Sequence, residues 1–188
     1  MTQRRRALSM RGLISDLSRW ASRVRARLFW ESPYGADPSW VALVDTRDWA
    51  MTNIDLLPIA EFGFPGPLRD KLVSAICNRS KTSTTSTVAE YQIDDEPLPQ
   101  VGSRQAVVDS QGRRVVIIET TDVEQVRLFE VPWEHARDEG EGYSSLVEWR
   151  LAHERFWEGE ELRAFLMDPN FVVDDDTFVV LERFRVID

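Results

Sequence analysis

Apolar residues recur at helical spacing in three stretches of the chain. Residues 11–30 carry an apolar stripe, with arginines mostly elsewhere on the helical wheel, at Leu13, Leu17, Trp20, Val24 and Leu28. A second helix is predicted to begin at Pro67 and to end near Asn78, because proline suits a first helical turn. A third helix covers "SLVEWRLAHERFWEG", capped by Ser144 or Ser145. A shorter helical piece is predicted over residues 160–167.

β-rich segments occupy the space between and after these helices. Residues 106–108 and 115–120 read as two strands, joined by a short turn that contains Gly112. The segment "TFVVLERFRVI" predicts a closing strand. This mixture predicts an α+β fold, in which a few antiparallel strands curl into a small barrel flanked by helices.

Composition changes divide the chain into three parts. Residues 1–30 form the basic amphipathic helical extension, and residues 31–60 form an irregular connector that contains Pro33, Gly35 and Pro38. Residues 61–188 form the single folded domain. The extension has three interpretations. It is a helix that packs on the domain, or an arm that contacts a membrane surface or RNA, or a product of an overlong gene model whose true start is Met51.

Charge is distributed unevenly along the chain, whose net charge is −9. Residues 1–30 contain eight arginines and one acidic residue, whereas residues 61–188 contain 14 basic and 26 acidic residues. An acidic domain repels long phosphate chains, so it is not a general polyanion binder. Any nucleic-acid ligand is therefore expected to be small or single-stranded.

Several classes of protein are not expected from this sequence. It has no apolar run of 18 residues, so no membrane span is expected, and it has no apolar signal segment with a cleavage site. The single cysteine, Cys77, excludes an internal disulfide and fits a reducing cytoplasm. No Cys/His cluster has zinc spacing, so we expect neither a metal nor a cofactor. The oligomeric state is not predicted.

The stretch "SKTSTTST", residues 80–87, sets one lysine among seven hydroxyl side chains. One interpretation is a solvated loop after the second helix, with Lys81 near the helix C-terminus. The other is a lysine that removes the proton of Thr84, which requires a lowered lysine pKa. Residues three apart share one face of a helical turn but face opposite sides of a strand. This mechanism therefore requires turn-like geometry at residues 81–84.

Five segments, in order, resemble the ASCH family of PUA-like domains over residues 62–186. They are "SKTSTT", "EPLPQVG", "VVIIETTDV", "HARDEGEGYSSLVEWRLAHERFW" and "VVLERFRVI". The resemblance implies a cleft for a base, a nucleoside or single-stranded RNA. Activities associated with the family are hydrolysis of N4-acylated cytidine nucleosides and ribonuclease activity.

The amidohydrolase members resembled here use a lysine, a threonine three residues later and a distant carboxylate. The resemblance places these roles on Lys81, Thr84 and Glu139, with Glu141 as the second choice for the carboxylate. One departure is Ser86, which stands where the small enzymes have arginine. Further ligand-contacting candidates are Thr82, Glu141, Tyr143, Trp149 and His153.

Three functions remain open from the sequence. The first is hydrolysis of an acylated cytidine-type nucleoside by the Lys81 group. The second is a non-catalytic module that binds single-stranded RNA, assisted by the basic extension. The third is a metal-assisted ribonuclease that uses the acidic run of residues 130–141.

Overall fold

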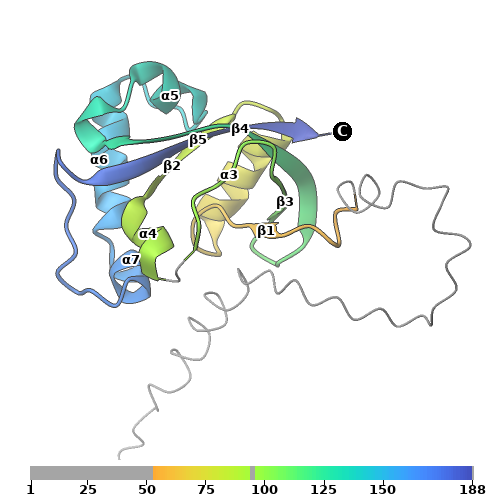
Figure 1. Cartoon of the computed structure of the whole chain (residues 1–188), viewed down its shortest axis with the longest axis horizontal. Helices are drawn as coiled ribbons and strands as arrows, with labels where there is room; N and C mark the ends of the chain where they lie inside the picture. Colours follow the sequence, from red (N-terminus) through yellow and green to blue (C-terminus); the bar gives the residue numbers. More distant parts are fainter. Residues whose placement is uncertain (1–52, 94–95, 188) are drawn as a thin grey trace, which may run out of the picture. The chain divides into compact units, whose positions relative to one another are not determined.

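The computed structural model describes residues 53–93 and 96–187 (Figure 1). The predicted basic helix of residues 1–30 and most of the connector lie outside these ranges. Within them, none of the helices combines the length and the hydrophobicity that a membrane span requires. The domain boundaries proposed from composition therefore stay a prediction.

The described ranges confirm an α+β fold with the main predicted elements in place (Figure 1). The helices are α3 (Pro67–Cys77), α4 (Val88–Ile93), α5 (Trp133–Asp138), α6 (Leu146–Trp157) and α7 (Glu160–Phe165), with a 3₁₀ turn, η2, at Leu128–Glu130. The strands are β1 (Ile59–Ala60), β2 (Ser83–Thr87), β3 (Arg104–Val108), β4 (Arg114–Arg127) and β5 (Phe178–Ile187). Ser145 caps α6, since its side chain accepts a hydrogen bond from the Glu148 amide.

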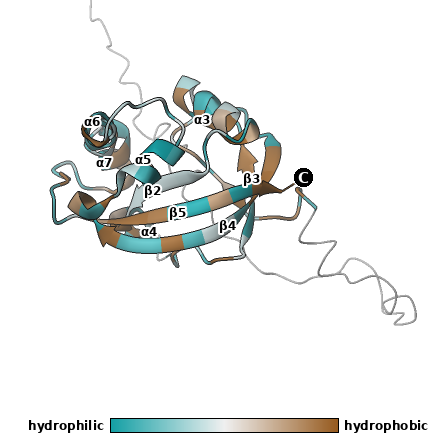
Figure 2. Ribbon diagram, turned by 90° about the horizontal axis from the view of Figure 1, so that it is seen from above, coloured by the Kyte–Doolittle hydropathy of each residue, from teal (hydrophilic) through white to brown (hydrophobic). Residues whose placement is uncertain are grey.

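The five strands form one sheet in the order β1-β3-β4-β5-β2. All neighbours are antiparallel except β1 and β3, which run parallel. β4 is the longest strand, and its register with β5 shifts between Thr120 and Asp122. Such a bulge bends a strand. The helices α3, α5 and α6 lie together on one side of β4 and β5 in Figure 2.

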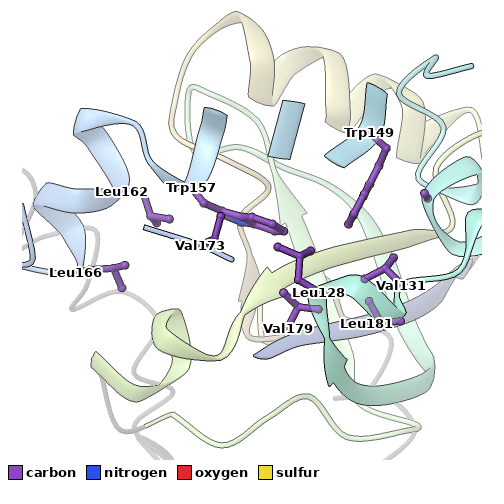
Figure 3. Close-up of a cluster of buried hydrophobic side chains, with 10 residues drawn as sticks. Leu128, Val131, Trp149, Trp157, Leu162, Leu166, Val173, Val179 and Leu181 are labelled. Carbon is purple, nitrogen blue, oxygen red and sulfur yellow. The ribbon is translucent and has the colours of Figure 1, made fainter. Parts of the chain in front are cut away.

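Two hydrophobic cores cover different ends of the sheet. The smaller core packs α3 against β3, β4 and β5 through Phe62, Leu72, Ile76, Val107, Ile118 and Phe184. The larger core lies under α6 and α7, where Trp149 and Trp157 meet Leu128, Val179 and Leu181 (Figure 3). The segment 80–87 links several of these elements, because the Ser80 amide donates to the Ala75 carbonyl of α3, the Thr82 amide donates to the Asp138 carbonyl of α5, and β2 pairs with β5.

The hydroxyl-rich stretch differs from the expected turn, because Ser83–Thr87 form strand β2 at the edge of the sheet. It pairs with β5 in antiparallel orientation, with Ser83 opposite Arg183 and Thr87 opposite Val179. Threonine is β-branched and favours strands. The sequence hid this strand because hydroxyl side chains occupy both of its faces, which leaves no alternation of apolar and polar residues.

The core under α6 generates a stability prediction. The Trp157 side chain is 1% exposed, so replacing it with alanine leaves a large cavity. We expect Trp157→Ala to lower the free energy of unfolding by about 3–5 kcal/mol in urea titrations. Val147→Ala on the outer face of α6, where Val147 is 68% exposed, is the control and should change it by less than about 0.5 kcal/mol. A cost for Trp157→Ala equal to that of the control would contradict this packing.

Candidate functional site

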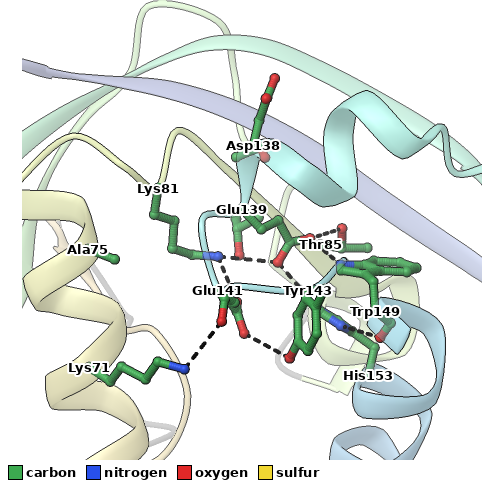
Figure 4. Close-up of polar contacts among 12 residues, drawn as sticks. Lys71, Ala75, Lys81, Thr85, Asp138, Glu139, Glu141, Tyr143, Trp149 and His153 are labelled. Atoms are coloured by element: carbon green, nitrogen blue, oxygen red, sulfur yellow. Dashed lines mark hydrogen bonds and ion pairs between the residues drawn. The ribbon is translucent and has the colours of Figure 1, made fainter. Parts of the chain in front are cut away.

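The centre of the site is the side chain of Lys81, which is 1% exposed. Its Nζ lies 3.2 Å from Glu139 Oε2 and 3.0 Å from Glu141 Oε1 (Figure 4). Burial disfavours the ammonium form, but the two carboxylates outweigh this effect and raise the pKa of Lys81. Lys81 is therefore charged at neutral pH and cannot accept a proton from a hydroxyl.

The Glu139 carboxylate, also 1% exposed, accepts hydrogen bonds on both oxygens. Oε1 lies 2.7 Å from the Thr85 hydroxyl and 3.1 Å from Trp149 Nε1. Oε2 lies 3.2 Å from Lys81 Nζ and 3.3 Å from His153 Nε2. Burial alone would raise the pKa of Glu139, but Lys81 and His153 hold it well below its usual range. Glu139 is thus an anion held in place by two donors on each carboxylate oxygen.

His153 carries the second positive charge of the site. Its Nδ1 lies 3.0 Å from the Trp149 carbonyl oxygen and its Nε2 lies 3.3 Å from Glu139 Oε2. A neutral imidazole donates from only one nitrogen, so two facing acceptors favour the doubly protonated ring. Burial opposes this charge, but Glu139 outweighs burial and raises the pKa of His153. The ring also stacks on Trp149, with centroids 4.2 Å apart.

His135 differs from His153 because burial dominates and lowers its pKa, against the attraction of Glu139. Its Nε2 lies 3.2 Å from the Thr84 carbonyl oxygen and 3.1 Å from the Thr85 hydroxyl oxygen. The neutral ring with a proton on Nε2 donates to that carbonyl, and the Thr85 hydroxyl remains free to donate to Glu139.

The end of α5 brings both carboxylates to Lys81. Gly140 follows the helix with φ of +66°, a conformation that favours glycine, and its amide returns to the Arg137 carbonyl at 3.0 Å. A Cβ at Gly140 would lie 2.1 Å from the Ser80 carbonyl oxygen. This close approach holds the loop against the segment before β2, so Glu139 and Glu141 both reach the same ammonium.

The hydroxyl groups of β2 and its preceding residues join the strand to α5. The Thr82 amide donates to the Asp138 carbonyl at 2.9 Å, and the Ser83 hydroxyl donates to the His135 carbonyl at 2.8 Å. Both carbonyls belong to the last turn of α5, where carbonyls run out of partners within the helix, and the His135 carbonyl also accepts from the Glu139 amide at 3.2 Å. The hydroxyl-rich composition therefore completes a helix end and orients Glu139.

The structure brings Lys81, Glu139, Glu141 and His153 together but not Thr84. Burial alternates along residues 81–87, so Lys81, Ser83 and Thr85 share one face. The Thr84 side chain faces the other side, because successive residues of a strand alternate. The turn-like geometry required for Lys81 and Thr84 is absent.

The other predicted contacts take different positions. The Thr82 hydroxyl is 3.4 Å from the Asp138 carbonyl oxygen, and the Tyr143 hydroxyl is 3.2 Å from Glu141 Oε2. Trp149 is fully buried and holds Glu139, so it offers no stacking surface to a base. Sequence reasoning missed Thr85 and His135. The "HARDE" spacing of four residues on a helix is the signal that could have paired His135 with Glu139.

One group within the described ranges has the chemistry of metal ligands. One ligand atom each from Glu139, Glu141 and His153 lie within 4.8 Å of one another. However, the Lys81 ammonium already supplies the positive charge beside both carboxylates. We therefore assign no metal to these residues. Elsewhere in the acidic run, Asp138 pairs with Arg183, and Glu130 accepts a hydrogen bond from the Arg127 amide.

Comparison with known families gives a match to the ASCH domain over residues 59–188. The chain belongs to the ASCH domain family. ASCH domains have a PUA-like fold of the RNA-binding type. A search of curated proteins gave no match.

Solved structures support this assignment. Protein EF3133 from Enterococcus faecalis V583, of family DUF984, is 28% identical with a TM-score of 0.61, over 69% of this chain and 76% of that chain. An ASCH domain from Lactobacillus crispatus JV V101 is 29% identical with a TM-score of 0.59, over 68% of this chain and 77% of that chain.

The tight approach at Gly140 generates a second prediction. Gly140→Ala is expected to destabilise the ASCH domain by about 3 kcal/mol or more, because the methyl group meets backbone in a left-handed conformation. Gly142→Ala is the matched control, since Gly142 has φ of +94° but no atom within 4 Å of its Cβ position. Thermal unfolding of the two variants checks this. Equal melting temperatures would show that the Ser80 contact is not tight.

The two histidines predict opposite dependences of stability on pH. Because the folded pKa of His153 is raised, its stabilisation is present below about pH 6.5 and is lost as pH rises through the folded value. The unfolding free energy of wild type minus that of His153→Gln should therefore shrink from pH 6 to pH 9, by about 1.4 kcal/mol for each unit of raised pKa.

His135→Gln provides the control of opposite sign. Its folded pKa is lowered, so the stabilisation that it contributes is present above about pH 6.5 and is lost as pH falls. Urea titrations across pH 5–9 measure both differences. A difference for His153→Gln that grows with pH would contradict a charged His153.

Proposed function

We propose that this ASCH domain hydrolyses the amide bond of an N4-acylated cytidine-type nucleoside at the Lys81 group. The observation that carries the proposal is the buried ammonium held between two carboxylates. Hydrolysis of an amide needs a cationic or hydrogen-bonding group for the oxyanion that forms on the carbonyl oxygen, and a carboxylate for proton transfer. Lys81 and its partners supply both.

In this proposal Lys81 donates a hydrogen bond that stabilises the oxyanion, and it does not act as a base. An ammonium has three N–H groups, and two of them are accounted for by Glu139 and Glu141. In this proposal the acyl carbonyl oxygen accepts a hydrogen bond from this ammonium. In a buried site this interaction is stronger than it would be in water, and removing one such donor typically costs 10²–10³-fold in kcat.

The chemistry of the site also favours a nucleoside over a long nucleic acid. Two carboxylates at the centre repel phosphates, and the paired charges Lys81 and His153 are already neutralised by them. A carboxylate oxygen accepts well from an exocyclic N–H of a base. The acidic domain therefore fits an uncharged, modified base better than a phosphate chain.

The proposal predicts that Lys81 is required for turnover and that Thr84 is not. Purified protein incubated with N4-acetylcytidine should release cytidine and acetate. Thr84→Val should retain at least about half of this activity, because its side chain faces away from Lys81. Lys81→Met should lose about 10²-fold or more.

Folding must be separated from chemistry in this assay. Lys81→Met removes the cation that the two carboxylates share, so the double variant Lys81→Met/Glu139→Gln, which removes one charge of each sign, is measured beside it. Both are checked by thermal unfolding. No cytidine from wild type, or full activity in the folded double variant, would reject the proposal.

A further inference from the structure

The two carboxylates on Lys81 are held very differently. The Glu139 side chain is 1% exposed and receives four donors, from Lys81, His153, Thr85 and Trp149. The Glu141 side chain is 12% exposed. Among the residues that the structure describes, its oxygens accept hydrogen bonds from Lys81 Nζ at 3.0 Å and from the Tyr143 hydroxyl at 3.2 Å (Figure 4).

The backbone of Glu141 is fixed although its side chain is less enclosed. Lys71 Nζ donates to the Glu141 carbonyl oxygen at 3.3 Å, and the preceding Gly140 packs on the Ser80 carbonyl. Movement of this carboxylate therefore requires only side-chain rotation and the loss of two hydrogen bonds, with Lys81 and Tyr143. Movement of Glu139 would break four hydrogen bonds in a buried place.

We propose that Glu141, and not Glu139 or Thr84, is the catalytic residue that transfers the proton, and that it leaves Lys81 to do so. This inference rests on the proposed function. In the resting site Glu141 covers the ammonium, which is itself almost inaccessible. When the acyl carbonyl oxygen takes the place of the Glu141 oxygen on Lys81, the released carboxylate remains beside the carbonyl carbon and accepts a proton from water.

The steps balance without any further reactant. Glu141 takes one proton from water as the water oxygen bonds to the acyl carbon, and the carbonyl electron pair moves to oxygen, where Lys81 stabilises the oxyanion. The carbon–nitrogen bond then breaks, and protonated Glu141 gives its proton to the departing N4 amine. The products are a carboxylic acid and the free cytidine, and Glu141 is again ionised.

Glu139 acts in this scheme as a positioning residue. Its four partners hold Lys81 and His153 in place, and its strongly lowered pKa makes it a poor proton acceptor. Tyr143 keeps its proton, since burial and the charge of Glu141 raise the pKa of its hydroxyl. It can therefore donate to Glu141 in the resting state and stay a neutral donor when Glu141 moves.

The test compares wild type, Glu141→Gln, Glu141→Ala and the control Glu124→Gln in the N4-acetylcytidine assay. Glu124 is exposed on β4, so Glu124→Gln makes the same Glu-to-Gln change away from the site. We expect Glu141→Gln to lower kcat by 10²–10⁴-fold and Glu124→Gln to leave it unchanged. We also expect added formate to restore part of the activity of Glu141→Ala, which a purely structural role of Glu141 would not produce.

The possible results separate the two proposals. Wild type that forms no cytidine rejects the proposed function and this inference with it. Active wild type together with fully active Glu141→Gln rejects only the role of Glu141. Loss of activity in Glu141→Ala without any rescue by formate, in protein that melts as wild type does, also overturns proton transfer by Glu141.

Discussion

The burial of a lysine ammonium is the constraint on which this site depends. Removing a charge from water costs several kcal/mol even after the protein relaxes, and only opposite charges and hydrogen bonds can offset this cost. Around Lys81 the chain places Glu139, Glu141 and His153, so that two positive and two negative groups balance. The same balance explains the raised pKa values of Lys81 and His153 and the lowered one of Glu139.

This balance requires parts of the chain that lie far apart in the sequence. Lys81 precedes an edge strand, while the carboxylates follow a short helix that ends more than 50 residues later. The contact between Gly140 and the Ser80 carbonyl and the hydrogen bonds of Thr82 and Ser83 to α5 fix the two segments together. The site is thus built on the junction of a strand and a helix, and its geometry is as rigid as that junction.

Sequence patterns predicted the elements that bury an apolar face. The helical spacing of apolar residues indicated α3 and α6, and β-rich composition indicated β3, β4 and β5; the structure confirms these elements. β2 and α5 were not predicted, because their signals are not hydrophobic. Thr82 and Ser83 donate hydrogen bonds to carbonyls at the end of α5. Glu139 is buried, but its place in an acidic run of the sequence does not indicate this.

The same limit explains which site residues could be found in advance. The family resemblance named Lys81, Glu139 and Glu141, and the structure brings these three together. It could not show that the Thr84 side chain faces away from Lys81. That orientation follows only once residues 83–87 form a strand with β5, which lies about a hundred residues later in the chain. Nor could it show that the positive charge of Lys81 is balanced by two carboxylates, which depends on burial and on distances in the fold rather than on sequence spacing.

The charge state of Lys81 is the central claim, and nitrogen-15 NMR of the lysine side chains measures it most directly. The chain has only two lysines, Lys71 and Lys81, so selective labelling gives two signals and Lys71→Arg assigns them. The account predicts that the Lys81 nitrogen keeps the chemical shift of an ammonium from pH 6 to above about pH 10. Deprotonation of Lys81 near neutral pH would contradict the account and would restore Lys81 as the base.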